Sequence, residues 1–202
     1  GEDFSDQLAA IKERYDEIIT GLKLDFSLAE DFSVIEENFK EKAGRDYAAS
    51  RGEYLNGKIM AAYLGYEFID AAQVIRFDED GAFEPELTNK LMAKKLASCE
   101  NGVIPGFYGA CADGTVKTFS RGGSDITGSI VARAMKADLY ENWTDVSGFL
   151  VTDPRIVENP EPVDLITYRE LRELSYMGAS VLHEEAIFPV RKAGIPINIR
   201  NT

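Results

Sequence analysis

The sequence predicts an α/β protein, a three-layer α/β/α sandwich with a mainly parallel sheet and a helical N-terminal third. Two observations lead to this fold class: helix-like segments fill the first third of the chain, and after Gly65 short apolar runs alternate with further helix-like segments. An Asp-Gly pair between two strand-like runs adds one antiparallel hairpin.

The first third is expected to form three helices, because apolar side chains recur there at three- and four-residue spacing. The first helix is predicted over residues 5–21 and the second over 32–43. The third reaches about Leu64, with Asp46 or Ser50 as its N-cap.

The remainder is expected to alternate between strands and helices. Strand, helix and strand in succession imply parallel pairing, and Asp113 and Gly114 supply the turn of the hairpin. The predicted elements are a strand over 66–71, a helix over 88–98, a strand over 103–110, a helix over 124–136, a strand over 137–144, helices over 168–178 and 184–194, and a strand over 196–200.

Composition fits one large domain and excludes several classes of function. The 202 residues are 45% hydrophobic, enough for a sizeable core, and the net charge of −13 weighs against a nucleic-acid partner. No apolar run approaches the ~20 residues that span a bilayer, and the first residues do not resemble a signal peptide. We therefore expect a cytoplasmic protein with no membrane partner. Cys99 and Cys111 are expected to be reduced thiols, and their spacing suggests no protein-bound metal.

The motif SRGGSD, residues 120–125, leaves a predicted strand and enters a predicted helix. Two glycines allow close approach of the backbone to a ligand, Ser124 can cap the helix, and the free amides at a helix start favour an anion. Arg121 can add a bidentate grip on a carboxylate. Taken alone, a Gly-Gly turn is more often only a tight connection.

A second motif, WTDVSGFLVTDPRIV, covers residues 143–157. Thr144 and Asp145 end a predicted strand, which is where open α/β sheets bind ligands. Asp153 and Arg155 belong to a second turn, made rigid by the proline between them. For either turn alone, a capping role for the aspartates is the simpler interpretation.

Four motifs together resemble, in order and spacing, those of aspartate kinases in the amino acid kinase family. The resemblance is strongest from residue 50 to the C-terminus. The motifs are SRGEYLNGKIMAAYL at 50–64, GFYGACADGTVKTFSRGGSD at 106–125, TDVSGFLVTDPRIV at 144–157 and MGASVLH at 177–183.

The resemblance implies an amino acid kinase-like fold and transfer of the ATP γ-phosphate to the side-chain carboxylate of L-aspartate. Glu53 would receive the substrate amino group and Arg121 its α-carboxylate, while Asp125 is the catalytic candidate because it would hold the lysine that contacts the transferring phosphoryl group. The full substrate set is Glu53, Arg121, Gly122, Gly123 and Ser124. The ATP set is Thr144, Asp145, Leu150, Asp153, Arg155 and Ser180.

Three positions depart from the family pattern. Leu150 stands where an aromatic residue is frequent, Ser180 replaces a lysine that contacts nucleotide, and Glu184 replaces a proline. These departures affect the nucleotide half of the expected site. The single histidine, His183, is expected to satisfy a local hydrogen bond, because a carboxylate nucleophile is already ionised and needs no general base.

The resemblance also predicts what accompanies this chain. Residues 1–202 are expected to be one partial catalytic domain, with a mostly helical aspartate side at 1–64 and an α/β part at 65–202 that holds ATP at 138–202. The family's N-terminal Lys-Phe-Gly-Gly strand and C-terminal regulatory domains have no match, so the 202 residues alone are expected to be inactive. Expected ligands are L-aspartate and ATP, with Mg²⁺ held mainly by nucleotide phosphates, and the complete enzyme is expected to be a homodimer.

Two alternatives remain open. The chain could be a non-catalytic domain that binds aspartate or nucleotide. It could also come from a related amino acid kinase that acts on glutamate or acetylglutamate. For the aspartate kinase, the product would be 4-phospho-L-aspartate, the first intermediate towards lysine, threonine and methionine.

Overall fold

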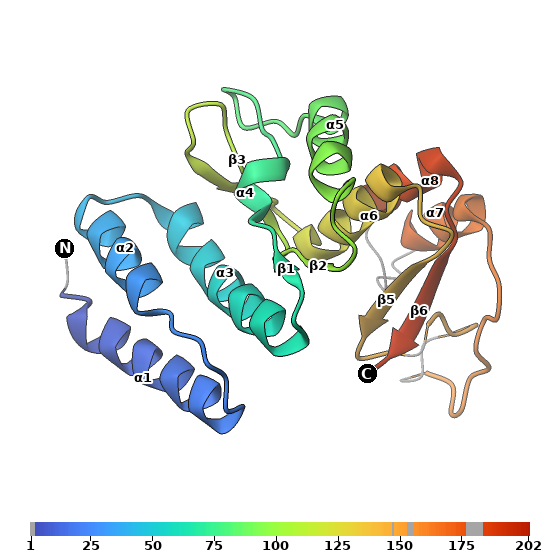
Figure 1. Ribbon diagram of the computed structural model, residues 1–202. Helices are drawn as coiled ribbons and strands as arrows, with labels where there is room; N and C mark the ends of the chain where they lie inside the picture. Colours follow the sequence, from blue (N-terminus) through green and yellow to red (C-terminus); the bar gives the residue numbers. More distant parts are fainter. Residues whose placement is uncertain (1–2, 147, 153–155, 177–183) are drawn as a thin grey trace.

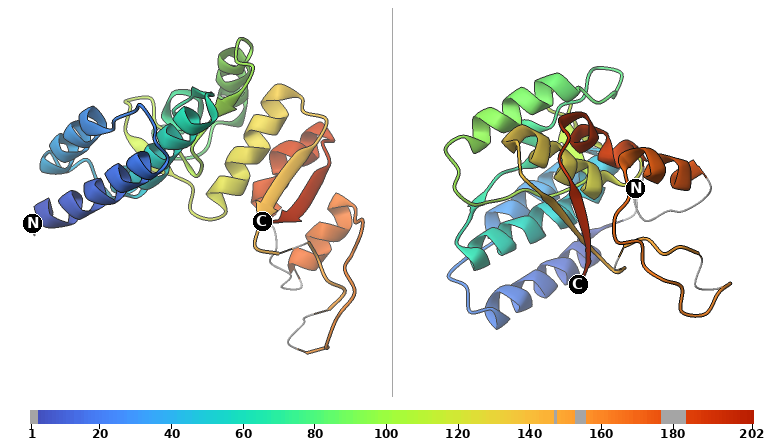
Figure 2. Two further views of the ribbon diagram at one scale, coloured as in Figure 1. Left: turned by 60° about the horizontal axis from the view of Figure 1, so that its bottom comes forward. Right: turned by 90° about the vertical axis from the view of Figure 1, so that its right-hand side faces the viewer.

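A computed structural model describes residues 3–146, 148–152, 156–176 and 184–202. Three helices form the N-terminal part: α1 (Ser5–Gly21), α2 (Ala29–Lys40) and α3 (Arg45–Leu64). They project to one side of the molecule, away from the C-terminal strands (Figures 1 and 2). The first helix has the predicted bounds, and the second begins three residues earlier than predicted.

The predicted N-cap of α3 is wrong. Gly44 holds the N-cap position with a φ of 94°, and Asp46 and Ser50 both lie inside the helix. Glycine reaches this backbone conformation without strain from a Cβ atom. The Ser50 hydroxyl instead donates to the Tyr47 carbonyl at 2.8 Å.

A partly buried ion pair joins α2 to α3. The Lys58 ammonium lies 2.7 Å from the Asp31 carboxylate, and the Tyr54 hydroxyl donates to the same carboxylate at 2.9 Å. Burial and this carboxylate both raise the pKa of Tyr54, which keeps the phenol a hydrogen-bond donor. Apolar side chains including Leu28 and Ile59 form the core beneath it.

The middle of the chain forms a parallel strand pair and a hairpin. Strand β1 (Glu67–Phe68) pairs in parallel with β2 (Gly102–Val103), and β3 (Tyr108–Ala110) pairs antiparallel with β4 (Val116–Thr118). Helix α5 (Pro85–Leu96) connects β1 to β2 together with a single-turn helix, α4 (Ala71–Val74), that the sequence did not predict. The predicted hairpin is confirmed.

The C-terminal part carries a second parallel pair. Helix α6 (Gly123–Met135) leads into β5 (Tyr140–Thr144), which pairs along its whole length with β6 (Ile197–Asn201). Helices α7 (Tyr168–Tyr176) and α8 (Glu184–Ala193) lie between them in the chain, and α8 packs against α6.

The α/β class and the predominance of parallel pairing are as predicted, but the strands do not join into one sheet. Within the described residues they form three separate two-stranded ladders. A groove lies between β2 and β5, and residues of α6 are among those that line it. Two cores lie on either side of α6, one built around Met92 and Tyr108 and the other around Ile187 and Val190.

Candidate active site

Two glycines stand at the N-terminus of α6. Gly122 is the N-cap with a left-handed φ of 58°, and a Cβ atom on Gly123 would lie 2.5 Å from the Phe107 Cβ. Glycine adopts the first conformation without strain, and at the second position it avoids a steric clash. The expected capping role of Ser124 is wrong, because the helix begins at Gly123 and no side chain caps it.

The first turn of α6 offers backbone donors beside a cationic side chain. The first helical hydrogen bond runs from the Ile126 amide to the Gly122 carbonyl at 2.9 Å, so the amides before it have no acceptor within the helix. Arg121 is exposed directly before this turn and makes no ion pair with any residue that the structure describes. This arrangement suits a carboxylate or phosphate group.

A hydrogen-bonded trio ties Asp125 to strand β5. The buried amide of Asn142 donates to the Asp125 carboxylate at 2.8 Å and to the Tyr140 hydroxyl at 3.0 Å. The Tyr140 hydroxyl lies 3.4 Å from the backbone carbonyl of Asp125. Burial raises the pKa of Tyr140, so its phenol is neutral at physiological pH. The Asp125 side chain is thus oriented by the strand expected to lead to the nucleotide.

Close packing fixes how α6 and β5 meet. A Cβ atom on Gly128 would clash with the Tyr140 hydroxyl oxygen, so a side chain at this helix position would displace the Tyr140 ring. Thr127 secures the other side of α6, since its hydroxyl accepts from the Phe107 amide at 3.1 Å and donates to the Gly123 carbonyl at 2.9 Å. These contacts fix the position of the N-terminus of α6 relative to β5 and to the Phe107 segment.

The groove between β2 and β5 has a volume of about 490 Å³. Gly102 and Ile104 line one side, Leu139 and Tyr140 line the other, and the exposed Ser124 lies at its edge. Gly106 also faces Ser124, because a Cβ atom there would come within 3.0 Å of the Ser124 hydroxyl. The groove therefore reaches the SRGGSD turn.

Strand β5 ends at two of the predicted ATP residues. The Thr144 hydroxyl lies 3.2 Å from the carboxylate of the exposed Asp145, and Thr144 also accepts a backbone hydrogen bond from Thr202. Leu150 is 43% exposed and pairs through its backbone with Pro162. These residues lie at or beyond the carboxyl end of a parallel pair, where α/β folds bind ligands.

Four predicted or discussed positions lie outside the described residues, namely Asp153, Arg155, Ser180 and His183. Their predicted roles stay predictions. Glu184 is described only through its backbone, as the first residue of α8.

Glu53 lies on the exposed side of α3, one residue after the carbonyl that accepts a hydrogen bond from Tyr15 at 3.0 Å. Its neighbour Arg51 is buried, with its guanidinium carbon 4.5 Å from each of the Tyr47 and Tyr54 rings. Within the described residues no hydrogen bond or ion pair joins Glu53 to Arg121.

The structure thus brings Ser124 and Asp125 together with β5 and the groove. Glu53 and Arg121 are both exposed, and within the described residues no ion pair joins them.

The sequence pattern of the amino acid kinase family matches residues 3–201, nearly the whole chain. This chain belongs to the amino acid kinase family. The predicted family resemblance and the predicted fold are therefore confirmed.

The proteins that this amino acid kinase resembles include three aspartate kinases. The chain is 42% identical to aspartokinase 3 of Bacillus subtilis over 96% of its length. An aspartate kinase structure from Clostridium acetobutylicum superposes with a TM-score of 0.93 and 58% identity over 100% of this chain. The E. coli aspartokinase III bound to aspartate and ADP superposes with a TM-score of 0.80 and 25% identity over 97% of this chain. The chain covers 46%, 46% and 48% of these three proteins, so it spans about half the length of its relatives.

Sequence reasoning missed the residues that orient Asp125 in this amino acid kinase. The sequence pattern identifies Asn142 and Tyr140 only as members of a strand. In the structure Asn142 is buried, with 7% of its surface exposed. Asn142 itself was the available signal, because the amide of an asparagine buried in a strand requires hydrogen-bond partners.

No described helix is both long and apolar enough to cross a membrane.

Proposed function

We propose that the protein containing this chain is an aspartate kinase that transfers the γ-phosphate of ATP to the side-chain carboxylate of L-aspartate. The observation that carries the proposal is the superposition of the entire chain on the Clostridium aspartate kinase at 58% identity. The bound aspartate and ADP of the E. coli relative support the choice of substrates.

Substrate binding is assigned to Arg121, to Glu53 and to the first turn of α6. Arg121 binds the α-carboxylate of aspartate and Glu53 its amino group, while Gly122, Gly123 and Ser124 let the substrate approach the first turn of α6. Two observations support this assignment: Arg121 makes no ion pair within the described residues, and the amides before Ile126 have no acceptor within the helix. The attacking carboxylate is already ionised, so positioning and electrostatics supply the catalysis.

Asp125 is the proposed catalytic residue because Asn142 orients its carboxylate, and because it directly follows Ser124, which lines the groove. It would orient a cation that contacts the transferring phosphoryl group. In the family this cation is the lysine of a Lys-Phe-Gly-Gly strand, and the groove between β2 and β5 has the position and backbone edges to receive that strand. We propose that the strand occupies the groove in the whole protein.

ATP is assigned to the carboxyl end of β5 and the segments after it. The proposed contacts are Thr144, Asp145, Leu150, Asp153, Arg155 and Ser180. Mg²⁺ would neutralise charge on the phosphates. Within the described residues no three acidic, His or Cys side chains cluster as a metal site.

We also propose that the product, 4-phospho-L-aspartate, is the first intermediate in the synthesis of lysine, threonine and methionine. The complete enzyme is proposed to be a homodimer. Residues 1–202 would be one catalytic domain within it. The remaining half of the relatives' length leaves room for further domains.

The proposal is tested by measuring ADP release from Mg-ATP by the whole protein. Release should require L-aspartate, and Arg121→Ala should raise the KM for aspartate roughly tenfold to hundredfold, as expected for loss of a charge-assisted hydrogen bond of about 1.5–3 kcal/mol. Arg169→Ala is the matched control, because Arg169 is an exposed arginine on α7. Equal rates with glutamate or acetylglutamate would contradict the substrate, and aspartate binding without ADP release would favour a non-catalytic domain.

A further inference from the structure

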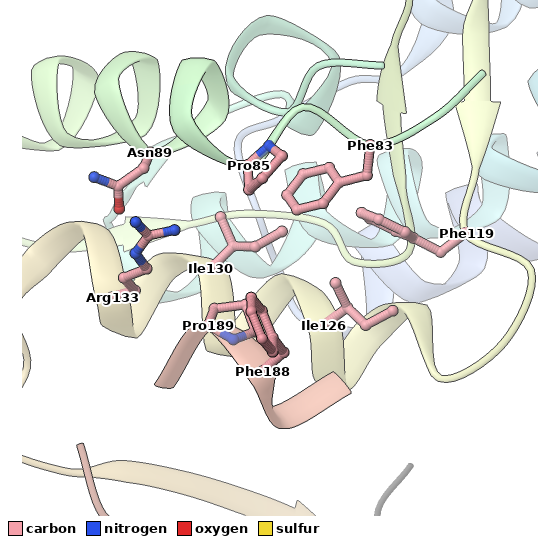
Figure 3. A pocket seen from close by; sticks show the side chains of 9 residues that line it. All are labelled: Phe83, Pro85, Asn89, Phe119, Ile126, Ile130, Arg133, Phe188 and Pro189. Carbon is pink, nitrogen blue, oxygen red and sulfur yellow. The ribbon is translucent and has the colours of Figure 1, made fainter. Parts of the chain in front are cut away.

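A second cavity lies on the side of α6 that faces away from the groove. It has a volume of about 430 Å³ and is enclosed by α5, α6, α8 and the chain after β4 (Figure 3). Ile126, Ile130 and Arg133 of α6 line this cavity, whereas Thr127 and Val131 of the same helix line the groove. The cavity is therefore separate from the proposed active site, although the two share a helix.

Aromatic rings form the walls of the cavity. Phe83 and Phe119 meet edge to face with their centroids 5.4 Å apart, and both contact the buried Phe77, which fixes their positions. Phe188 closes another side and remains 52% exposed. Rings arranged in this way favour another planar ring, because edge-to-face contacts add to the burial of apolar surface.

One end of the cavity is cationic. The Arg133 side chain is only 16% exposed, and one guanidinium nitrogen lies 2.9 Å from the Glu86 carboxylate. Lys192 lies 3.1 Å from the same Glu86 oxygen, so a single carboxylate serves two cations. Arg133 is the one charged residue among those described as lining the cavity, so the charge that faces its interior is positive. Arg133 also retains N–H groups that make no hydrogen bond within the described part of the chain.

We infer that this cavity binds a small aromatic carboxylate. The ring would lie among Phe83, Phe119 and Phe188, and the carboxylate would accept hydrogen bonds from Arg133. A cavity of a few hundred cubic ångströms, mostly apolar and with one convergent charged group, is typical of small-molecule sites. The volume suits one ring system with a short side chain, and the planar guanidinium matches a carboxylate. This inference does not depend on the proposed kinase activity.

The test is calorimetric titration of the whole protein with 3-phenylpropionate and with its neutral analogue 3-phenylpropanamide. The acid should bind with a dissociation constant on the order of 0.1–1 mM, given the ordinary affinity of ligands of this size. The amide should bind at least about tenfold more weakly, because it cannot form the charge-assisted pair. No binding of the acid at concentrations near 10 mM would overturn the inference.

Three variants locate the ligand. Arg133→Met keeps the apolar length of the side chain and leaves Glu86 paired with Lys192, so it should weaken binding of the acid about tenfold or more without affecting the amide. Ile130→Trp should block both compounds by filling the cavity. Arg121→Ala should leave binding unchanged. Loss of binding in Arg121→Ala but not in Arg133→Met would place the acid in the proposed substrate site and overturn the inference.

Discussion

At the scale of single residues, the candidate site depends on specific hydrogen bonds and on close packing. The Asn142 amide holds Asp125 and Tyr140 together, and Gly123 and Gly128 are glycines because neighbouring side chains occupy the space of their missing Cβ atoms. The sequence predicted the importance of Gly123 and Asp125 through a motif. It could indicate that Asn142 needs a hydrogen-bond partner, but not that the partner is Asp125, because the two are brought close only by the folding of α6 against β5.

Asn142→Leu should reduce both stability and turnover. The substitution keeps the volume but removes the donor, leaving the Asp125 carboxylate and the Tyr140 hydroxyl without it, at a cost of about 1–3 kcal/mol. Urea unfolding should show this loss, and kcat in the whole protein should fall more than the KM for aspartate changes. Asn198→Leu, on the neighbouring strand β6, is the comparison variant. Unchanged kcat in Asn142→Leu would show that Asp125 needs no such support.

Gly123→Ala should destabilise the fold by about 1–3 kcal/mol, the usual cost of forcing an atom into a packed site. The added Cβ atom would meet Phe107 Cβ at 2.5 Å and its Cα at 2.8 Å. Gly21→Ala is the control, since nothing lies within 4 Å of the position its Cβ would take. The two variants are compared by their urea midpoints, and equal midpoints would mean that the Phe107 segment yields easily.

At the scale of elements, the sequence pattern predicted most helices, the hairpin and the predominance of parallel pairing, but not the separation of the strands into three ladders. Helix α1 has the predicted bounds because its periodicity lies within the segment itself. The four-residue α4 was missed because one turn shows no periodicity; it depends on Asp70, whose carboxylate accepts from the Ala72 amide at 3.0 Å and from the Tyr108 hydroxyl at 2.8 Å. The division into three ladders could not be predicted, since short apolar runs show where strands form but not which of them pair edge to edge.

The contact between α2 and α3 should show strong coupling in a double-mutant cycle of Asp31→Asn and Lys58→Met. Their side chains are 11% and 24% exposed, so solvent screens the pair only partly. We expect a coupling energy of about 0.5–3 kcal/mol from chemical denaturation. The exposed pair Arg14 and Glu17, measured in the same way, should give less than about 1 kcal/mol. A coupling energy no larger than that of the exposed pair would show that the ion pair of Asp31 and Lys58 does not stabilise the contact between these helices.

At the scale of the whole molecule, the proposed function has the groove filled by a further strand that carries a lysine. Phosphoryl transfer relies on cations and amides around the phosphate, and loss of one such donor commonly lowers the rate about a hundredfold to a thousandfold. The 202 residues alone should therefore release ADP at least about a hundredfold more slowly than a chain that also contains the Lys-Phe-Gly-Gly strand. They should also scatter more light, because open strand edges promote association. Equal rates would show that this strand is dispensable.

The pairing of β5 with β6 also has a consequence for synthesis on the ribosome. Tyr140 pairs with Ile197, so the partner of β5 is made long after β5 itself. At 5–20 residues per second the interval is about 3–11 s. During that time β5 presents a bare edge and the side chain of Trp143, which is 54% exposed even in the folded chain. The nascent protein should therefore be most dependent on chaperones in this interval, after α6 has formed and before the last strand emerges.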